Sequence, residues 1–526
     1  GSIQVTNLIV IDGIHDVQGF GLGYGLSNFY LSFGNSETAG TNGDDHWMGN
    51  SALSNAYNGL DGNDRITGGI GDDVLIGGSG ADTINGGADN DALTGGANND
   101  NLTGGSGNDT FNVDSGTDTI TDLTTGDILN VSSGATANAT NISGFVATSS
   151  TSNSGTANLT ASNSGGTIDV GNSTTGAYNL TGLAGADTLK GNGNGDTING
   201  GSGNDNIDGR GGNDQINAGD GDDTIIVSSA GQGNGDTVDG GNGTDTLQLS
   251  AGSHSFSNDA SIQNVQTITL NASGTTVDLT GQTEGLSITG AAGGDIITAG
   301  SGNDIISGAG GADTITGAGG ADTISLGSSD SASDIIIFNS TSGMDIVKQF
   351  TAGSSNGDIM KYTGNLSDQE SSANTTNGSD GTDDLLIGDF VINAKNSSLD
   401  NNKLVIGFST AVTQNGLSSG TAIDFTGAGI SSSQIIGAIE TSLENSNAGS
   451  GAGLLSGTGG AVSHGDINEA KILLFTDGGS GANEDVAMVI YNEGGSAEGD
   501  YSGELTLANI LESTTISTLT HDNFWG

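Results

Sequence analysis

Apolar residues recur at every ninth position over much of this chain, and each stands in the middle of a polar, apolar, polar triplet. Six consecutive nonapeptides between residues 68 and 121 repeat the pattern G-G-x-G-x-D-x-U-x, in which U is apolar. We number the positions one to nine, so that Asp73 stands at position six and Leu75 at position eight. Positions seven to nine predict a short strand with one buried face, and the first five positions predict a turn. A strict short period predicts a solenoid of stacked coils.

Glycine at positions one, two and four predicts a tight turn with positive φ angles. Asp89 and Asn98 replace the glycine at position four, and both residue types tolerate a left-handed conformation. Two nonapeptides make one coil with a strand on each side, so equivalent aspartates recur every 18 residues, about 4.8 Å apart. The alternative is a glycine-rich acidic linker, but a linker would not keep an apolar residue in register.

The stacked aspartates predict columns of negative charge. Two carboxylates at that spacing repel by about 1 kcal/mol in water and by several in a less polar site. The chain has only eight lysines and arginines against 62 acidic residues, so the countercharge must come from solution. Carboxylates together with backbone carbonyls form a hard oxygen site that suits Ca²⁺ better than Mg²⁺.

Composition narrows the function further. A net charge of −54 predicts a chain that is extended without cations and folds when they bind. The same acidity makes nucleic acid and anionic membranes unsuitable partners without a calcium bridge. The chain has no cysteine, which excludes disulfides and thiolate sites, and no apolar run approaches the ~20 residues of a membrane span. It opens on Gly1 and Ser2 with no signal peptide, which is typical of a tag scar or a processed end.

The nonapeptides resemble those of RTX proteins, the type I secreted bacterial proteins with calcium β-rolls. In that family, a site takes the carbonyls at positions two and four and the aspartate of one repeat. The carbonyls at positions one and three and the aspartate come from the repeat 18 residues later. The resemblance implies one site from Gly69, Gly71 and Asp73 with Gly86, Ala88 and Asp91, and another from Gly78, Gly80 and Asp82 with Gly95, Ala97 and Asp100.

The aspartates in sixth place, with two that follow off-period, are the predicted calcium ligands and fall into three blocks. The first block contains Asp45, Asp64, Asp73, Asp82, Asp91, Asp100, Asp109, Asp118 and Asp127. The second contains Asp187, Asp196, Asp205, Asp214, Asp223, Asp236 and Asp245, and the third contains Asp295, Asp304, Asp313 and Asp322. Asp334 and Asp345 follow off-period and are expected to end the third block.

We therefore predict an all-β protein, a parallel β-roll solenoid in three blocks with a C-terminal β-rich (α+β) cap. Residues 1–40 are an N-terminal cap or the end of an upstream domain, 41–130 the first calcium roll, and 131–180 a polar linker or degenerate coils. Residues 181–250 are the second roll, 251–289 metal-free coils, 290–350 the third roll, and 351–526 a C-terminal domain with a secretion and assembly signal.

Within the C-terminal region, residues 403–408, 471–475 and 486–491 are strand-like, and the apolar spacing over 431–443 predicts a helix. The hairpin at 471–491 and the terminus 519–526 resemble those of RTX surface proteins. An ordinary small α+β cap is the alternative for this region.

The sequence predicts no catalytic residues. Residues 416–420 match G-x-S-x-G, but such a match is expected by chance among 97 glycines. The five histidines are scattered and form no zinc motif.

The leading hypothesis is a secreted structural protein resembling RTX surface-layer proteins, in which calcium rigidifies the rolls and bridges molecules into a lattice. The resemblance implies type I secretion to the surface of a Gram-negative bacterium, with self-association and with a cell-surface glycan or lipopolysaccharide as a further partner. A second hypothesis is the calcium-dependent C-terminal secretion module of a larger adhesin, toxin or exoenzyme. A third is a calcium-regulated ligand-binding module that uses the polar face of 131–180.

Overall fold

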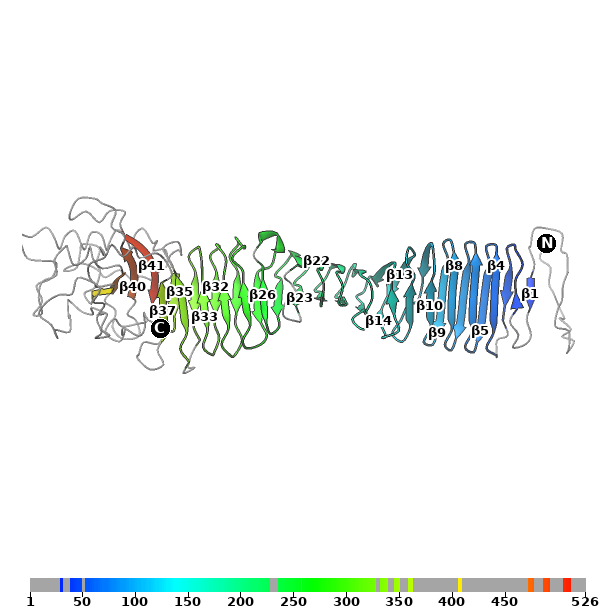
Figure 1. Cartoon of the computed structure of the whole chain (residues 1–526), viewed down its shortest axis with the longest axis horizontal. Coiled ribbons are helices and arrows are strands. Elements are labelled where there is room, and N and C mark those ends of the chain that lie inside the picture. Colours follow the sequence, from blue (N-terminus) through cyan, green and yellow to red (C-terminus); the bar gives the residue numbers. More distant parts are fainter. Residues whose placement is uncertain are drawn as a thin grey trace, which may run out of the picture. The chain divides into compact units, whose positions relative to one another are not determined.

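The structure, a computed structural model, describes residues 29–31, 38–49, 53–227, 235–256, 258–327, 332–338, 345–350, 358–362, 405–408, 472–476, 486–491 and 505–511. The chain divides into two units, residues 1–246 and 247–526. In each unit, parallel strands and tight turns repeat as stacked coils, which confirms the predicted all-β parallel solenoid (Figure 1). None of the described segments is a helix of the length and apolarity needed to cross a membrane.

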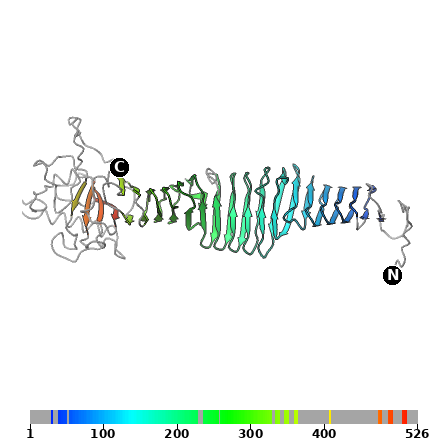
Figure 2. The same cartoon turned by 90° about the horizontal axis from the view of Figure 1, so that it is seen from below.

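Successive strands of the first unit alternate between sheets. Figure 2 shows the same stacked coils turned by 90°. One sheet has the order β1 (Phe29–Leu31), β3 (His46–Met48), β5 (Arg65–Ile70), β7 (Thr83–Ala88), β9 (Asn101–Ser106), β11 (Thr117–Ile120), β13 (Thr136–Ile142), β16 (Thr156–Ala161), β18 (Tyr178–Thr181), β20 (Thr197–Ser202), β22 (Gln215–Asp220) and β24 (Thr237–Asn242). A second sheet has the order β15 (Ser152–Asn153), β12 (Ile128–Val131), β10 (Thr110–Val113), β8 (Ala92–Ala97), β6 (Val74–Ser79), β4 (Ala56–Asp61) and β2 (Thr38–Ala39). A third contains β14 (Gly144–Val146), β17 (Thr167–Asp169), β19 (Thr188–Lys190), β21 (Asn206–Asp208), β23 (Thr224–Val227) and β25 (Thr246–Leu249).

The second unit repeats this arrangement. One sheet has the order β26 (Ser253–Ser255), β29 (Thr276–Asp278), β31 (Ile296–Thr298), β33 (Thr314–Thr316), β35 (Ile335–Phe338) and β37 (Ile359–Tyr362). The other has β28 (Thr267–Leu270), β30 (Ser287–Thr289), β32 (Ile305–Ser307), β34 (Thr323–Ser325) and β36 (Asp345–Lys348), followed by β41 (Leu505–Leu511), β40 (Val486–Tyr491), β39 (Ile472–Thr476) and β38 (Val405–Phe408). The 3-10 helix η1 (Asp259–Ser261) leads directly into β27 (Ile262–Gln263).

Position eight supplies the core. Leu75 pairs with Leu93, Leu93 pairs with Phe111, and all three side chains are fully buried. Stacking the coils buries these side chains, because a single coil cannot cover its own apolar residue. Each such burial contributes roughly 1.5–3 kcal/mol. The solenoid is therefore stabilised coil by coil.

Strands also occupy the stretches that lack aspartates at position six. In β13 and β16, Ala137, Ala139 and Leu159 are fully buried, and in β28 and β30 Ile268 and Ile288 are buried in register with each other. Apolar ladders thus continue through these coils, where position six has no aspartate.

The structure corrects two details of the predicted repeat. The strands run beyond position nine into position three of the next nonapeptide, as in β6. Positive φ angles occur at positions two and four, such as 129° at Gly69 and 98° at Gly71, but not at position one. As expected, Asp89 and Asn98 take the left-handed conformation, with φ angles of 72° and 80°. Position one requires glycine for a different reason, which the metal centres below make clear.

At the C-terminal end of the second unit, the three predicted strands correspond to β38, β39 and β40. β39 and β40 pair as an antiparallel hairpin, and β41 joins β40 to the coil strand β36. The predicted helix at 431–443, the motif at 416–420 and the terminus 519–526 lie outside the described residues.

The paired residues Leu60 and Gly78 test the turn conformation. Both stand at position two with positive φ, 78° at Leu60 and 115° at Gly78. Gly78→Ala should cost more than about 2 kcal/mol, because the left-handed strain of ~1–2 kcal/mol is joined by overlap with the Leu60 carbonyl. Leu60→Gly should change stability by less than about 1 kcal/mol, since relief of that strain offsets the flexibility of glycine. Urea unfolding at fixed calcium would measure both, and equal effects would contradict this account.

Candidate metal centres

The aspartates at position six form columns, and each of these side chains bonds the backbone of the coil before it. Oδ1 of Asp91 accepts the backbone N–H of Asp73 at 2.8 Å, and Oδ1 of Asp109 accepts that of Asp91 at 2.9 Å. In the first pair of columns, one column contains Asp45, Asp64, Asp82, Asp100 and Asp118. The other contains Asn55, Asp73, Asp91, Asp109 and Asp127. In the next pair, one column contains Asp187, Asp205, Asp223 and Asp245. The other contains Asp196, Asp214 and Asp236. In the last pair, one column contains Asp295, Asp313, Asp334 and Asp358. The other contains Asp304, Asp322 and Asp345.

Insertions between coils leave the columns intact. Asp236 lies 22 residues after Asp214, and Asp334 lies 21 residues after Asp313, yet both accept the expected N–H. The third block also runs past its predicted end, because Asp358 accepts the N–H of Asp334 at 3.0 Å. The sequence carried a signal for Asp358: Met360 follows it at the same two-residue spacing that separates aspartate and apolar residue in every repeat.

The first turn of one column is held by an amide instead of a carboxylate. Asn55 takes the place of an aspartate, and its Nδ2 donates to Oδ1 of Asp73 at 2.8 Å. The predicted ligands pass from Asp45 to Asp64 and omit Asn55. The spacing from Asn55 to the buried Tyr57 is the signal that was missed.

The second carboxylate oxygen of most column aspartates has no partner in the protein. Oδ2 is buried without a hydrogen bond in a set of aspartates that spans all three blocks. They include Asp64, Asp73, Asp82, Asp91, Asp100, Asp118, Asp187, Asp205, Asp214, Asp223, Asp304 and Asp322. A buried carboxylate oxygen without a donor costs several kcal/mol unless a cation or a proton satisfies it.

The glycine at position one leaves room for this oxygen. A Cβ atom on Gly68 would overlap both Oδ2 of Asp73 and the carbonyl oxygen of Gly86 in the next coil. The same holds at Gly77, where a Cβ atom would meet Oδ2 of Asp82 and the carbonyl of Gly95. Two oxygens therefore border one small space between successive coils, and no side chain can enter it from position one.

Further carbonyls turn toward the same gap. A Cβ atom on Gly87 would overlap the carbonyl oxygen of Gly69, and one on Gly80 would overlap that of Gly62. The carbonyls at positions two and four thus point toward the following coil. At position three, the Ala88 carbonyl accepts the N–H of Gly71 at 3.1 Å. The structure therefore brings Gly69, Gly71, Asp73, Gly86 and Ala88 to one gap between two coils.

Some aspartates have a donor for Oδ2 within the protein. Oδ2 of Asp127, at the end of its column, accepts the N–H of Thr124 at 2.7 Å and its hydroxyl at 3.1 Å. Oδ2 of Asp196 accepts the N–H of Asn192, and that of Asp295 accepts the N–H of Ala291. At these aspartates a protein N–H or hydroxyl satisfies the Oδ2 oxygen, which a cation must satisfy in the rest of the columns.

A second ladder at position five bonds the coils in the opposite direction. Oδ1 of Asp72 accepts the N–H of Asn90 at 2.9 Å, and Oδ1 of Asn90 accepts that of Asn108 at 2.8 Å. These side chains are exposed, and asparagine serves as well as aspartate. Each turn is therefore bonded to the coil before it through position six and to the coil after it through position five.

Burial raises the pKa of the column carboxyls. The pKa of Asp91 rises from an ordinary 3.8 to about 7, first by burial and then by repulsion from Asp73 and Asp109. The pKa of Asp214 rises to about 8 for the same reasons, with Asp236 and Asp196 as the repelling neighbours. Without a cation, the columns hold protons near neutral pH.

The donor set fits calcium. Each gap offers carboxylate and carbonyl oxygens, and no group of three or more His, Cys, Asp or Glu side chains occurs within the described residues. Backbone carbonyls must then supply most of the ligands, and hard cations such as Ca²⁺ bind carbonyl oxygens readily. Asp169 and Asp208 lie outside the columns and have ion pairs with Arg210.

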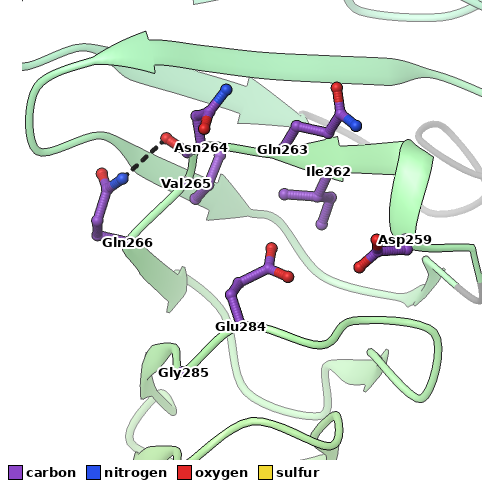
Figure 3. A pocket seen from close by; sticks show the side chains of 8 residues that line it. All are labelled: Asp259, Ile262, Gln263, Asn264, Val265, Gln266, Glu284 and Gly285. Carbon is purple, nitrogen blue, oxygen red and sulfur yellow. Dashed lines mark hydrogen bonds between the residues drawn. The ribbon is translucent and has the colours of Figure 1, made fainter.

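A hollow of about 350 Å³ in the second unit has a different character. Asp259 and Glu284 extend toward it from two sides, below Ile262 and Val265 (Figure 3). Asp259 accepts the Thr283 hydroxyl at 3.1 Å, and Glu284 accepts the Thr283 N–H at 3.1 Å.

Comparison with protein-family models identifies RTX calcium-binding nonapeptide repeats. The model matches residues 58–93, 85–120, 176–206, 190–225 and 289–324. These ranges fall in all three blocks of column aspartates. No curated protein matches the chain.

Replacing Asp91 and Asp100 together by asparagine should weaken the middle of the first block. The amides keep their size and an acceptor oxygen but lose the charge that a cation needs, so the calcium midpoint measured by circular dichroism should rise several-fold. The matched control is Asp44→Asn with Asp72→Asn, which removes the same charge at position five, where asparagine is a natural occupant. Equal midpoints for the two variants would contradict the assignment.

Stability without calcium should fall as the pH rises. In the folded state Asp91 and Asp214 hold protons up to about pH 7 and about pH 8, whereas the unfolded chain releases them near pH 4, so the folded state binds more protons in between. In chelator, the β-sheet signal should therefore strengthen from pH 8 to pH 5.

Calcium binding has the opposite pH dependence, because the ion displaces these protons. Its midpoint should fall at least about ten-fold between pH 6 and pH 8. A midpoint independent of pH would show that the columns carry no protons to displace.

Proposed function

Because this chain belongs to the proteins with RTX calcium-binding nonapeptide repeats, we propose that it is a secreted structural protein of a bacterial cell surface. In this proposal, calcium folds and stiffens the coils, and the stiffened molecules assemble into a surface layer. Type I secretion and a location outside the cell are part of the same proposal.

One observation carries it: buried carboxylate oxygens without protein partners recur at a fixed position along both units. Such columns are unstable where calcium is scarce and stable where it is abundant, as it is outside the cell. The chain would therefore remain unfolded during export and fold afterwards. The proposed ligands are the Oδ2 atoms of the column aspartates with the carbonyls at positions one to four, as at Gly69, Gly71 and Asp73 with Gly86, Ala88 and Asp91.

A structural role without catalysis also suits the described residues. They consist of repeated coils whose buried groups are apolar ladders and aspartate columns. A solenoid that grows by adding coils supplies length and stiffness, which a lattice requires. A net charge of −54 means that molecules packed side by side would need divalent cations at their acidic contacts.

Electron microscopy of the purified chain tests this function. Two-dimensional arrays should form in millimolar calcium and disperse in chelator, and magnesium at the same concentration should not replace calcium. Chains that fold in calcium but stay dispersed at every protein concentration would contradict the surface-layer role while leaving calcium binding intact.

A further inference from the structure

One face of the first unit differs in chemistry from the rest of this acidic chain. It is the outward side of β7, β9, β11, β13, β16, β18, β20 and β22, and we call it the neutral face. A single row runs along its centre through Asn101, Thr119, Asn138, Asn158, Asn179 and Thr197, one residue from each of six neighbouring strands in register. The outward positions of the eight strands carry threonine, asparagine, glutamine or glycine, except at the strand ends next to the turns, where Ala88, Ser106, Ser202 and Asp220 stand.

Hydrogen bonds hold part of this row in place. Nδ2 of Asn158 donates to Oδ1 of Asn138 at 2.7 Å, and Nδ2 of Asn179 donates to Oδ1 of Asn158 at 2.6 Å. Side chains tied in this way lose little further freedom when another surface covers them. Each amide still has one N–H and one lone pair to offer outward.

The other surfaces of the first unit carry charges or apolar groups. On β17, β19 and β21, Asp169, Lys190 and Asp208 stand in register on the outward side. On β6, Val74 is half exposed. The turns that flank the neutral face bear exposed acids such as Asp89. Charge is thus concentrated at the ends of the coils and kept off the neutral face.

We propose that the neutral face is the surface through which two copies of this chain dock, within the assembly described under the proposed function, on which this inference rests. With a net charge of −54, contact through the turns or through β17, β19 and β21 would bring carboxylates together, whereas two neutral faces can meet without repulsion. Interfaces generally have a centre depleted of charge and a polar rim. Here the centre is the row of amides and hydroxyls, and the rim is the acidic turns.

The available area suits a weak contact that calcium reinforces. Eight strands at ~4.8 Å give a length of roughly 40 Å, and about four residues of flat strand give a width of roughly 13 Å. The face would bury roughly 1,000 Å² in total between two copies, which is near the lower limit for a specific interface. The acidic rims would still need cations, so association remains calcium-dependent after the coils have folded.

Added charge on the neutral face tests the proposal. The variant carries Asn101→Asp and Asn199→Asp, both at exposed outward positions, and the matched control carries Thr110→Asp and Asn206→Asp on the other two sheets. Sedimentation velocity of the full chain in calcium should show that the variant needs at least ten-fold more protein to assemble, while the control assembles like the parent. Circular dichroism should give all three proteins the same calcium midpoint.

The outcomes separate this inference from the proposed function. If the parent and both variants assemble alike, the docking surface is elsewhere, but the surface-layer function stands. If the parent stays monomeric in calcium, both proposals fail. If the parent is instead retarded in gels containing an uncharged β-glucan, and the variant is not, the neutral face binds glycan and the docking proposal is overturned.

Cysteine cross-linking gives a second measurement, because the chain contains no cysteine of its own. Asn199→Cys lies on the neutral face and Asn206→Cys on β21, and both positions are exposed. A short bismaleimide added to calcium-loaded protein should produce covalent dimers from Asn199→Cys and few from Asn206→Cys. Dimers from Asn206→Cys alone would overturn the proposal.

Discussion

The structure depends on the burial of aspartates one above another. A column aspartate uses one oxygen to accept a backbone N–H of the preceding coil, at 2.8 Å from Asp91 to Asp73, and in most of the columns the other oxygen has no protein donor. The hydrogen bond sets the spacing of the coils, and the unpaired oxygen sets the need for a cation. The same side chain therefore supplies both the register of the solenoid and its dependence on calcium.

Two kinds of stacking interaction coexist in these coils. The ladder at position five uses exposed amide or carboxylate oxygens, as in Asp72 and Asn90, and needs no metal. The columns at position six are buried and acquire raised pKa values, so without calcium they compete for protons. Because the position-five ladder does not involve the cation, a coil that loses its cation keeps these bonds to its neighbours.

The coils without column aspartates complete this arrangement. Between β13 and β18, Asn138, Asn158 and Asn179 bond one another outside a core of alanine and leucine. These coils carry no buried carboxylate that calcium must satisfy, so metal-dependent blocks alternate with a metal-independent one inside a continuous stack. In such a chain, the coils between β13 and β18 can provide a template on which the neighbouring coils stack when they bind calcium.

The sequence alone determined the period, the parallel coils and the calcium chemistry, because position six and position eight repeat without regard to distant residues. Spacing placed the aspartates that follow insertions, such as Asp236 and Asp334, among the ligands. It also carried a two-residue signal at Asn55 and Asp358, but only the hydrogen bonds to the adjacent coil put these two residues in the columns. Only the tertiary structure decided why position one is glycine: the Asp73 carboxylate and the Gly86 carbonyl of the next coil fill that space. The neutral face likewise emerged only from stacking, because the threonines and asparagines of its central row are 18 to 21 residues apart in the chain and become one row when coils align.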